Sequence, residues 1–393
     1  MTAGSALAGL RVLDISRVLA GPSCGQLLAD MGADVIKVEP PDGDENRRWP
    51  PFVASGASCN FDSVNRGKRN LAVDLKHPNG QRIVHGLADR ADVLLLSFLP
   101  QTAAKLGLDP AVLTARNPRL VVCEVTGYGA AGPMAERPGY DLMMQAFAGA
   151  MSMTGLEGEP PVRTGLSFID MATGLAAYGA VLTALMARAT TGRGTVVRTS
   201  LLETGISLLG YHAVAWLAAG VMPKREGSGV WHLVPYQAFR CADEYVLVGA
   251  PNEAAWQRLC AALDLPALAA DPRFTTNADR VTHRDALIPL LSARFAEREA
   301  AHWVARLEAH RVAVSPINRI DQVLTHPQVL ANDMVVQAGD ARLVGTPFKL
   351  AEGGGVAADP PASLGRDADA ILRDELGLDD AAIAALRADA VIP

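Results

Sequence analysis

The chain has 393 residues, of which 49% are hydrophobic and 20% are charged, and its formal net charge is −6. This length and composition predict two or three folded units with a large core. The acidic balance argues against nucleic acid as the main partner, although local basic clusters are still able to hold a phosphorylated small molecule.

The first half of the chain alternates short apolar strands with helices. Strands are predicted at 10–15, 34–38, 92–97 and 120–126, and helices at about 23–31 and 83–88. This alternation is typical of a mostly parallel sheet with helices on both faces. Ligands of such sheets bind beyond the C-terminal strand ends, where Arg17, Ser97 and Gly127 fall. The segment RVLAGP stands where GxGxxG would, so a dinucleotide cofactor is not expected.

Two long uncharged segments follow. Asp170 comes immediately before the first, 171–187, which is predicted to be a buried helix. A helix N-terminus favours negative charge, so Asp170 is interpreted either as an N-cap or as an ionised nucleophile. The second segment, 204–223, has the length of a membrane span, but three glycines, a tyrosine and a histidine interrupt it. We prefer a helix buried in the core or in a subunit interface.

The segment from about 225 to 325 has a different pattern. A hairpin is predicted from strands at 235–240 and 245–248, followed by helices at about 253–263, 283–297 and 299–310. This pattern indicates a smaller α+β domain. A Gly- and Pro-containing surface connection is predicted at 353–361, and amphipathic helices at 367–376 and 379–387.

The cysteines and histidines indicate neither a metal site nor a disulfide framework. The five cysteines include no CxxC pair, and the eight histidines lack HExxH spacing. The N-terminus reaches Arg11 without an apolar signal segment. We therefore expect no metal, no membrane attachment and a cytoplasmic location.

Eight segments, in their order and spacing, resemble the class III coenzyme A transferase family, the group of formyl-CoA transferases, carnitine-CoA transferases and methylacyl-CoA racemases. They span nearly the whole chain and read LRVLDISRVLAGPSCGQLLADMGADVIKVEPPDGD, NRGKRNLAVDLKHPNG, VTGYGAAGP, RPGYDLMMQAFAGAMSMTG, FIDMATGLAAYGAVLTAL, TGRG, GTPFKL and LGLDDAAIAAL. The resemblance implies an α/β fold and an interlocked ring homodimer. Its expected parts are a Rossmann-like large domain (1–200 and 330–393), a linker helix (201–224) and a small α+β domain (225–329).

The resemblance places the catalytic nucleophile on Asp170. In this family the carboxylate attacks an acyl-CoA thioester, and aspartyl anhydride and aspartyl–CoA thioester intermediates follow. CoA and acyl-CoA are then substrates, with no permanently bound cofactor. Water must be kept away from both intermediates, because it would hydrolyse them.

The family's CoA-contacting positions carry over to eight residues of this chain: Val18, Ala20, Ala72, Val73, Ser97, Phe98, Lys105 and Tyr140. Tyr140, beside Asp141, corresponds to a tyrosine near the thioester, and the alternative is a half-buried core residue. Ser97 replaces an Asn that bonds CoA. Lys105 replaces an Arg that meets the CoA phosphates, and lysine lacks the bidentate fork. Additional basic residues are therefore candidates for the phosphates, or else solvated surface charges: Arg47, Arg48, Lys68 and Arg69.

Two further groups of residues are candidates for substrate contacts. Gly227 and Gly229 would allow a lid to move over the site. His232 comes two places later than the family pattern expects, so its contact with the site is left open. Arg17 is the best placed by sequence to receive the distal carboxylate of a dicarboxylic acid, with Arg47 and Arg48 as second choices.

Three functions remain open at this point. The first is transfer of CoA, with succinyl-CoA as expected donor and a dicarboxylate as acceptor, because ENRRWPPFV and GSGVWHLVPYQAF look closest to succinyl-CoA:dicarboxylate transferases. The second is α-methylacyl-CoA racemisation. That branch uses a histidine where this chain has Tyr140, and tyrosine exchanges protons poorly near neutral pH. The third is a non-catalytic CoA-binding protein, against which the retained Asp170 argues.

Overall fold

The computed structural model describes residues 5–53, 56–357 and 359–393, and these form two compact units. The first unit consists of the chain up to Gly149, Thr164–Ala213 and Pro327–Pro393, and the second of Ala150–Arg163 and Val214–His326. Residues 150–163 thus group with the second unit and not with the sequence around them. The reason is local: Leu156 forms a β-bridge with Glu226, and Arg225 donates a hydrogen bond to the Glu159 carbonyl.

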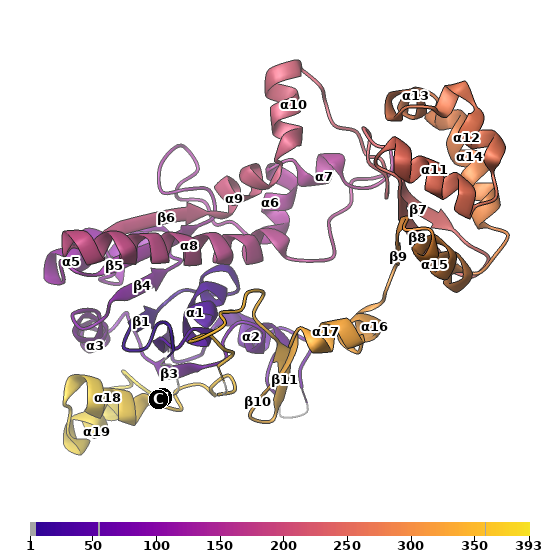
Figure 1. Cartoon of the computed structure of the whole chain (residues 1–393). Helices are drawn as coiled ribbons and strands as arrows, with labels where there is room; N and C mark the ends of the chain where they lie inside the picture. Colours follow the sequence, from indigo (N-terminus) through magenta and orange to yellow (C-terminus); the bar gives the residue numbers. More distant parts are fainter. Residues whose placement is uncertain (1–4, 54–55, 358) are drawn as a thin grey trace. The chain divides into compact units, whose positions relative to one another are not determined.

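Six parallel strands form the central sheet of the first unit in the order β3-β2-β1-β4-β5-β6 (Figure 1). The strands are β1 (Arg11–Asp14), β2 (Asp34–Glu39), β3 (Lys68–Ala72), β4 (Val93–Leu96), β5 (Val121–Thr126) and β6 (Val196–Ser200). The order reverses between β1 and β4, and open α/β sheets bind ligands outside the C-terminal strand ends at such a reversal. The predicted parallel α/β sheet is confirmed.

Helices cover both faces of this sheet, and its strands are apolar on both sides, as buried parallel strands are. Val12 and Val93 face a cluster with α1 (Ala20–Asp30) and α8 (Phe168–Thr191). Leu13 and Leu94 face a cluster with α3 (Pro78–Ala88), α18 (Ala368–Leu376) and α19 (Asp380–Ala388). The other elements of this unit are η1 (Glu45–Arg48), α2 (Cys59–Asp62), α4 (Pro100–Lys105), α5 (Pro110–Arg116), α6 (Asp141–Phe147), α9 (Leu201–Leu208), α17 (Pro327–Ala331), and the hairpin strands β10 (Val335–Ala338) and β11 (Ala341–Val344).

Helix α8 is long and apolar enough to cross a membrane, but a core helix of a soluble protein has the same properties. It packs closely on α1 at Gly174, where the absence of a side chain permits the approach. A Cβ there would overlap the Ser23 hydroxyl and lie 2.7 Å from the Ala20 carbonyl oxygen. Ala177 and Val181 are fully buried in the same contact region. Its opposite side is exposed at Met171 and Met186, so the predicted buried helix is buried on one side only in the single chain.

The predicted single linker helix at 201–224 is also wrong. The segment forms α9 and then α10 (Tyr211–Ala219), which are bent by 74° relative to each other. The physical reason lies at Gly210, whose φ of +53° ends the right-handed helix between them. Neither helix is buried along its length, and Leu217 is 81% exposed.

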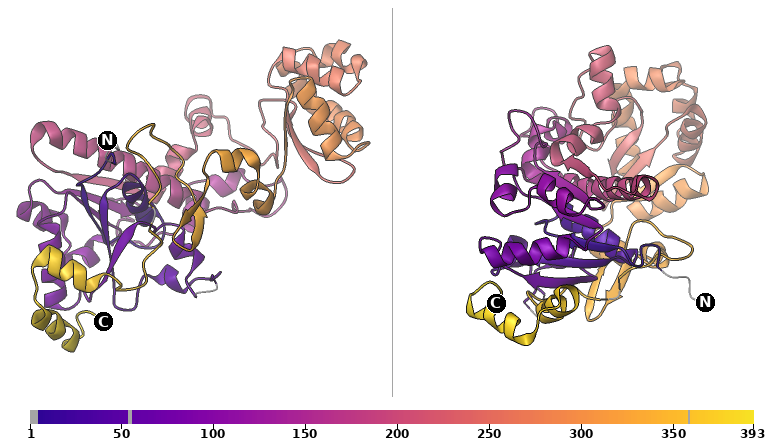
Figure 2. Two further views of the ribbon diagram at one scale, coloured as in Figure 1. Left: turned by 60° about the horizontal axis from the view of Figure 1, so that its bottom comes forward. Right: turned by 90° about the vertical axis from the view of Figure 1, so that its left-hand side faces the viewer.

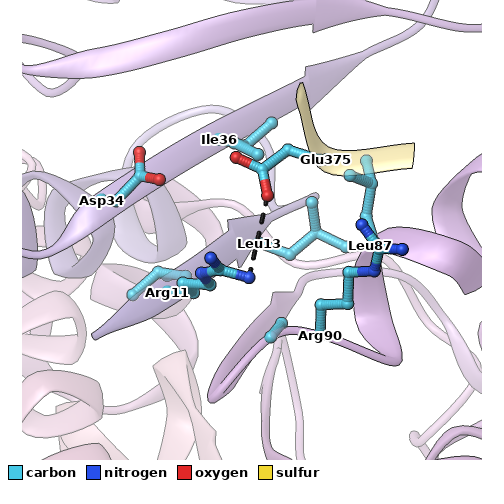
Figure 3. Close-up of a pocket in the computed structure, with 9 residues that line it drawn as sticks. Arg11, Leu13, Asp34, Ile36, Leu87, Arg90 and Glu375 are labelled. Carbon is cyan, nitrogen blue, oxygen red and sulfur yellow. Dashed lines mark ion pairs between the residues drawn. The ribbon is translucent and has the colours of Figure 1, made fainter. Parts of the chain in front are cut away.

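The C-terminal helices are attached to the beginning of the chain's first strands. Figure 2 shows these yellow helices beside the indigo and purple N-terminal segments. Asn70 donates its backbone N–H to the Asp367 carboxylate (2.8 Å), and Arg69 pairs with both Asp34 and Glu375 (2.5 and 2.8 Å). The small cavity in Figure 3 lies here, between Arg11 and Glu375, and its volume of about 20 Å³ holds little more than one water molecule. These contacts hold the C-terminal helices against the end of the sheet where the strands begin, which is opposite to the C-terminal strand ends.

The second unit contains a three-stranded antiparallel sheet in the order β7-β8-β9. Its elements are α7 (Ala150–Met153), most of α10, β7 (Tyr236–Arg240), β8 (Tyr245–Gly249), α11 (Glu253–Ala262), α12 (Pro266–Ala270), η2 (Pro272–Phe274), α13 (Asn277–Thr282), α14 (Arg284–Phe295), α15 (Ala300–Ala309), β9 (Ala313–Pro316) and α16 (Ile320–Leu324). Trp256, Phe295 and Trp303 are fully buried in its own hydrophobic core. The predicted hairpin and helices of a small α+β fold are confirmed.

Candidate active site

A pocket of about 180 Å³ lies at the C-terminal ends of β1, β4 and β5, where the strand order reverses. Arg17, Ser97 and Gly127, which the sequence placed at strand ends, all line it. Asp170 lines it as well, together with four other predicted site residues: Val18, Ala20, Phe98 and Tyr140. The pocket therefore brings together predicted residues from five separate stretches of the chain.

Val18 stands in a strained turn between β1 and α1. Its φ of +65° is unfavourable for a β-branched residue and persists only where surrounding contacts impose it. Those contacts come from the loop after β2: the Val18 N–H donates to the Asp44 carboxylate (3.1 Å), and the Asn46 side-chain amide donates to the Val18 carbonyl (2.7 Å). Asp44 is itself buried beside Lys37, at 3.5 Å. The turn is therefore clamped in one conformation at the pocket wall.

A buried ion pair lies beneath this turn. Lys68 Nζ donates to Asp14 Oδ2 (2.8 Å), to the Pro22 carbonyl (2.7 Å) and to Asn65 Oδ1 (2.8 Å). An ammonium group has three donors, so all of them are used. Burial lowers the pKa of Lys68 to about 8, against the opposing charge of Asp14. The suggestion that Lys68 binds CoA phosphate is therefore wrong, because its side chain is buried and fully bonded inside the fold.

Asp170 is the third residue of α8 and is 8% exposed. The predicted boundary, with the helix starting after Asp170, is thus wrong by three residues. The N-cap residue, Ser167, makes no side-chain capping bond. Instead the Asp141 carboxylate, at the start of α6, accepts the N–H groups of Ile169 (2.9 Å) and Asp170 (3.1 Å). Asp170 is therefore not a capping residue, and its carboxylate is left for the pocket.

The electrostatics around Asp170 also differ from the expectation of a readily ionised carboxylate. Burial raises the pKa of Asp170 to about 7, and the negative charge of Asp141 adds to the rise. The helix N-terminus does not reverse this, because Asp141 already occupies two of its free N–H groups. Perturbed carboxyl pKa values in a cleft are typical of catalytic groups.

Among the described residues that line the pocket, Arg17 is the one cation. The Arg17 backbone N–H donates to Ser97 Oγ (2.8 Å), and this hydrogen bond joins the loops after β1 and β4. The Arg17 guanidinium lies over the Phe98 ring, at 4.8 Å from its centroid. Tyr140, half exposed, lies next to Asp141 at the start of α6. A cation, a buried carboxylate and apolar ring surface thus share one small cavity.

Several pocket residues were not predicted. One of them is Gly139, which approaches the predicted Gly127 so closely that a Cβ on Gly127 would lie 2.8 Å from the Gly139 backbone. This contact closes the loop 128–138 beside the pocket. The glycine-rich segment GYGAAGP was visible in the sequence, but its return to Gly139 was not. Glu45, also in the lining, had no distinguishing pattern.

Other predicted residues lie outside the pocket lining. Ala72 and Val73 are fully buried at the end of β3, and Lys105 is exposed on α4. Arg47 donates twice to Glu39, at 2.7 Å each, and lies over Phe61. Arg48 is an exposed partner of Asp42, at 3.4 Å.

Gly227, Gly229 and His232 belong to the second unit. Gly227 has a φ of +62°, a conformation that favours glycine, and lies against Leu156. The His232 carbonyl accepts a hydrogen bond from the Asn277 side chain (2.8 Å), and Arg284 donates to the carbonyls of Val230 and Trp231. This loop is therefore held by α13 and α14 within its own unit.

Comparison with known proteins decides the family. The profile of CoA-transferase family III matches residues 7–368. The chain belongs to CoA-transferase family III. Succinyl-CoA:glutarate CoA-transferase of Mus musculus is 39% identical over 98% of this chain and 90% of the relative. A succinate–glutarate CoA-transferase of Agrobacterium fabrum is 37% identical, with 84% of each chain covered.

Solved structures agree with this assignment. The crystal structure of a CaiB/BaiF family protein from Brucella suis superposes with a TM-score of 0.87 at 36% identity, covering 95% of this chain and 100% of that one. The predicted family and the predicted α/β fold class are therefore confirmed. The protein is an enzyme of CoA transfer whose substrates are CoA thioesters, and a non-catalytic CoA-binding role is set aside.

Proposed function

We propose that this enzyme transfers CoA from succinyl-CoA to a small dicarboxylic acid, with Asp170 as the covalent nucleophile. The observation that carries the proposal is the pocket itself, in which the buried Asp170 carboxylate and the Arg17 cation share one cavity. The named activities of the mouse and Agrobacterium relatives, which exchange succinate and glutarate, support the choice of dicarboxylates.

In the first half-reaction, an Asp170 oxygen attacks the thioester carbonyl and the C–S bond breaks, which gives a mixed anhydride and free CoA thiolate. The thiolate then attacks the Asp170 carbonyl carbon and displaces the donor acid. In the second half, the acceptor carboxylate displaces the thiolate from Asp170 and forms a new anhydride. The thiolate attacks the acceptor's carbonyl in that anhydride, which releases the new acyl-CoA and restores the Asp170 carboxylate.

The raised pKa of Asp170 suits this exchange. A more basic carboxylate is a stronger nucleophile toward a thioester, and at neutral pH a substantial fraction of Asp170 is still ionised. The N-terminal turn of α1 lines the pocket with Ala20 and Gly21, so the positive end of its dipole lies at the cavity. There it would stabilise the negative charge that develops on the thioester oxygen.

Arg17 is the proposed partner of the distal carboxylate. It is the cation of the lining, whereas Arg47 is held by Glu39 and Arg48 lies outside the pocket. A second carboxylate leaves water at a high cost unless a cation receives it. Ser97, Phe98, Val18, Ala20 and Tyr140 are proposed to contact the CoA thioester end, and Ala72, Val73 and Lys105 the rest of CoA. Gly227, Gly229 and His232 are proposed as a lid.

Racemisation remains the alternative on this fold. It needs a group that exchanges protons near neutral pH at the position of Tyr140. The pocket lining contains no histidine among the described residues, and the named relatives described above are transferases. Both observations favour transfer.

We further propose that the enzyme is a cytoplasmic, interlocked homodimer. Large apolar side chains remain exposed on α8, α9 and α10, which is unusual for a monomer. They are Met171, Leu175, Met186, Ile206, Leu208, Trp216 and Leu217. A second copy of the chain is proposed to cover these side chains.

The function is tested by incubating purified enzyme with succinyl-CoA and a panel of acids, and following new acyl-CoA by mass spectrometry. Succinate and glutarate should be accepted in preference to acetate and formate. A matched pair of variants, Arg17→Met in the pocket and Arg48→Met outside it, separates recognition of the distal charge from loss of any surface charge. A preference for monocarboxylates would contradict the proposed substrate class.

A further inference from the structure

Asp141 is a buried carboxylate without a cationic partner. It is 7% exposed, and no ion pair in the described part of the chain includes it. Buried carboxylates are usually paired with a cation, so an unpaired one calls for another explanation. Its hydrogen bonds come from Ile169 and Asp170 in the first turn of α8, and from Gln145 in its own helix, α6.

We propose that Asp141 is a positioning residue for Asp170: it caps α8 from a neighbouring helix, directs the Asp170 carboxylate into the pocket and maintains its nucleophilic strength by its own charge. This inference rests on the proposed role of Asp170 as nucleophile.

The first argument is the bond to Asp170 itself. Asp141 Oδ2 accepts the backbone N–H groups of the second and third residues of α8, which an N-cap side chain normally receives. One of these N–H groups belongs to Asp170. The nucleophile's own backbone is therefore attached to Asp141, so a shift of that carboxylate changes the direction of the Asp170 side chain.

The second argument is that Asp141 is held in turn. Gln145, one helical turn later and almost fully buried, donates to Asp141 Oδ1 and to the Leu166 carbonyl (3.0 Å). Its oxygen accepts the Thr164 N–H (3.0 Å). The amide thereby fixes the Asp141 carboxylate against the segment that leads into α8. In Asp141→Asn, an amide whose oxygen continues to cap α8 would turn its NH2 group toward the Gln145 NH2. The Gln145 amide cannot reverse, because both of its ends are bonded.

The third argument is electrostatic. The titratable or charged groups described around Asp170 are Tyr140 and Asp141 at the start of α6, Arg17 after β1 and Glu45 in η1. Glu203 of α9 accepts a hydrogen bond from the Ser200 hydroxyl. Around Gly174, one turn after Asp170, the side of α1 that packs on α8 contributes Ala20 and Ser23, which carry no charge. Of these groups, Asp141 is the one whose charge adds to burial in raising the pKa of Asp170. Removing that charge should make Asp170 more acidic and a weaker nucleophile.

The test compares Asp141→Asn and Asp141→Glu with the wild type and with Asp379→Asn, which alters a capping carboxylate at the remote helix α19. The measurements are kcat/KM for succinyl-CoA from pH 5 to 9, CoA affinity by calorimetry and Tm. For Asp141→Asn we expect a loss in kcat/KM of about tenfold or more. We also expect its acid limb to move to lower pH, with CoA affinity within about threefold of the wild type. Asp141→Glu should restore the wild-type acid limb and most of the rate, and Asp379→Asn should change neither.

Two results would overturn the inference. One is an Asp141→Asn profile that matches the wild type in height and position. The other is a loss of rate that parallels losses of Tm and CoA affinity without movement of the acid limb, since that describes a purely structural residue. If Asp141→Asn does not fold, the Asp141→Glu variant tests the inference instead. This variant keeps the negative charge, so an acid limb displaced from that of the wild type would contradict the role of the charge. Labelling of Asp170 in the wild type tests the nucleophile separately, so the two proposals fail independently.

Discussion

Replacing Asp170 by asparagine should stabilise the protein while it abolishes the reaction. The wild-type carboxylate is buried beside Asp141, and its pKa rises from an ordinary value of 3.8 to about 7. A carboxyl group with a raised folded-state pKa binds its proton more tightly in the folded state, so the folded state loses stability as the pH rises from 3.8 to about 7. Above that window the loss is complete, and below it the loss is absent.

The size of the effect follows from the same values. The difference between 3.8 and about 7 corresponds to roughly 4 kcal/mol of unfolding free energy at full ionisation. At about pH 5 only about a third of that loss has developed. The uncharged side chain of the Asp170→Asn variant does not suffer it. The stabilisation of this variant over the wild type should therefore be larger at about pH 8 than at about pH 5, by roughly 2–3 kcal/mol.

The assay is thermal unfolding of both proteins at one protein concentration at about pH 5 and about pH 8, with Asp389→Asn as an exposed control. The Tm of Asp170→Asn should exceed that of the wild type by a clearly larger margin at the higher pH, and Asp389→Asn should follow the wild type at both. An equal margin at the two pH values, or a lower Tm for Asp170→Asn at the higher pH, would refute the reasoning that Asp170 is buried with a raised pKa.

Further outcomes are expected from the same structure. Asp170→Asn should lower kcat by orders of magnitude with little change in CoA affinity, and a residual kcat above about a tenth of wild type would contradict a nucleophilic role. Arg17→Met should raise KM for glutarate by about tenfold or more, from loss of a charge-assisted bond of ~1.5–3 kcal/mol, and leave acetate nearly unaffected; equal effects on both acids would count against it. Lys105→Arg should tighten CoA binding or leave it unchanged in calorimetric titrations, because arginine offers a bidentate contact to phosphate; a marked loss would place Lys105 away from the phosphates. Sedimentation at nanomolar concentration should show a dimer without folded monomer, and a folded monomer would contradict an interlocked assembly.

Much of the first unit was predictable because its strands are short apolar runs between clear turn signals. The strands β1, β2, β4 and β5 lie within a residue or two of the predicted ranges. The rule that ligands bind beyond C-terminal strand ends then brought Arg17, Ser97 and Gly127 to one pocket. Order along the chain and strand polarity are enough for that step.

What escaped prediction depends on side chains that meet across long stretches of sequence. Asp141 caps α8 from 28 residues away, and the sequence pattern at Ser167–Asp170 gives no sign of a remote cap. Lys68 resembled a surface cation because its partner Asp14 is 54 residues earlier. The helix break at Gly210 was not predicted, because a single glycine is tolerated within many helices and gives no sign of its backbone conformation.

The central claim is that Asp170 becomes acylated during turnover, and chemical trapping tests it most directly. Enzyme is incubated with succinyl-CoA and hydroxylamine, digested, and its peptides are analysed by mass spectrometry, with Glu45 and Asp141 as neighbouring carboxylates for comparison. The account predicts a hydroxamate on Asp170 that requires succinyl-CoA and is absent from the peptides that contain Glu45 or Asp141. An unmodified Asp170 during active turnover, or a hydroxamate on Glu45 or Asp141 in its place, would contradict it.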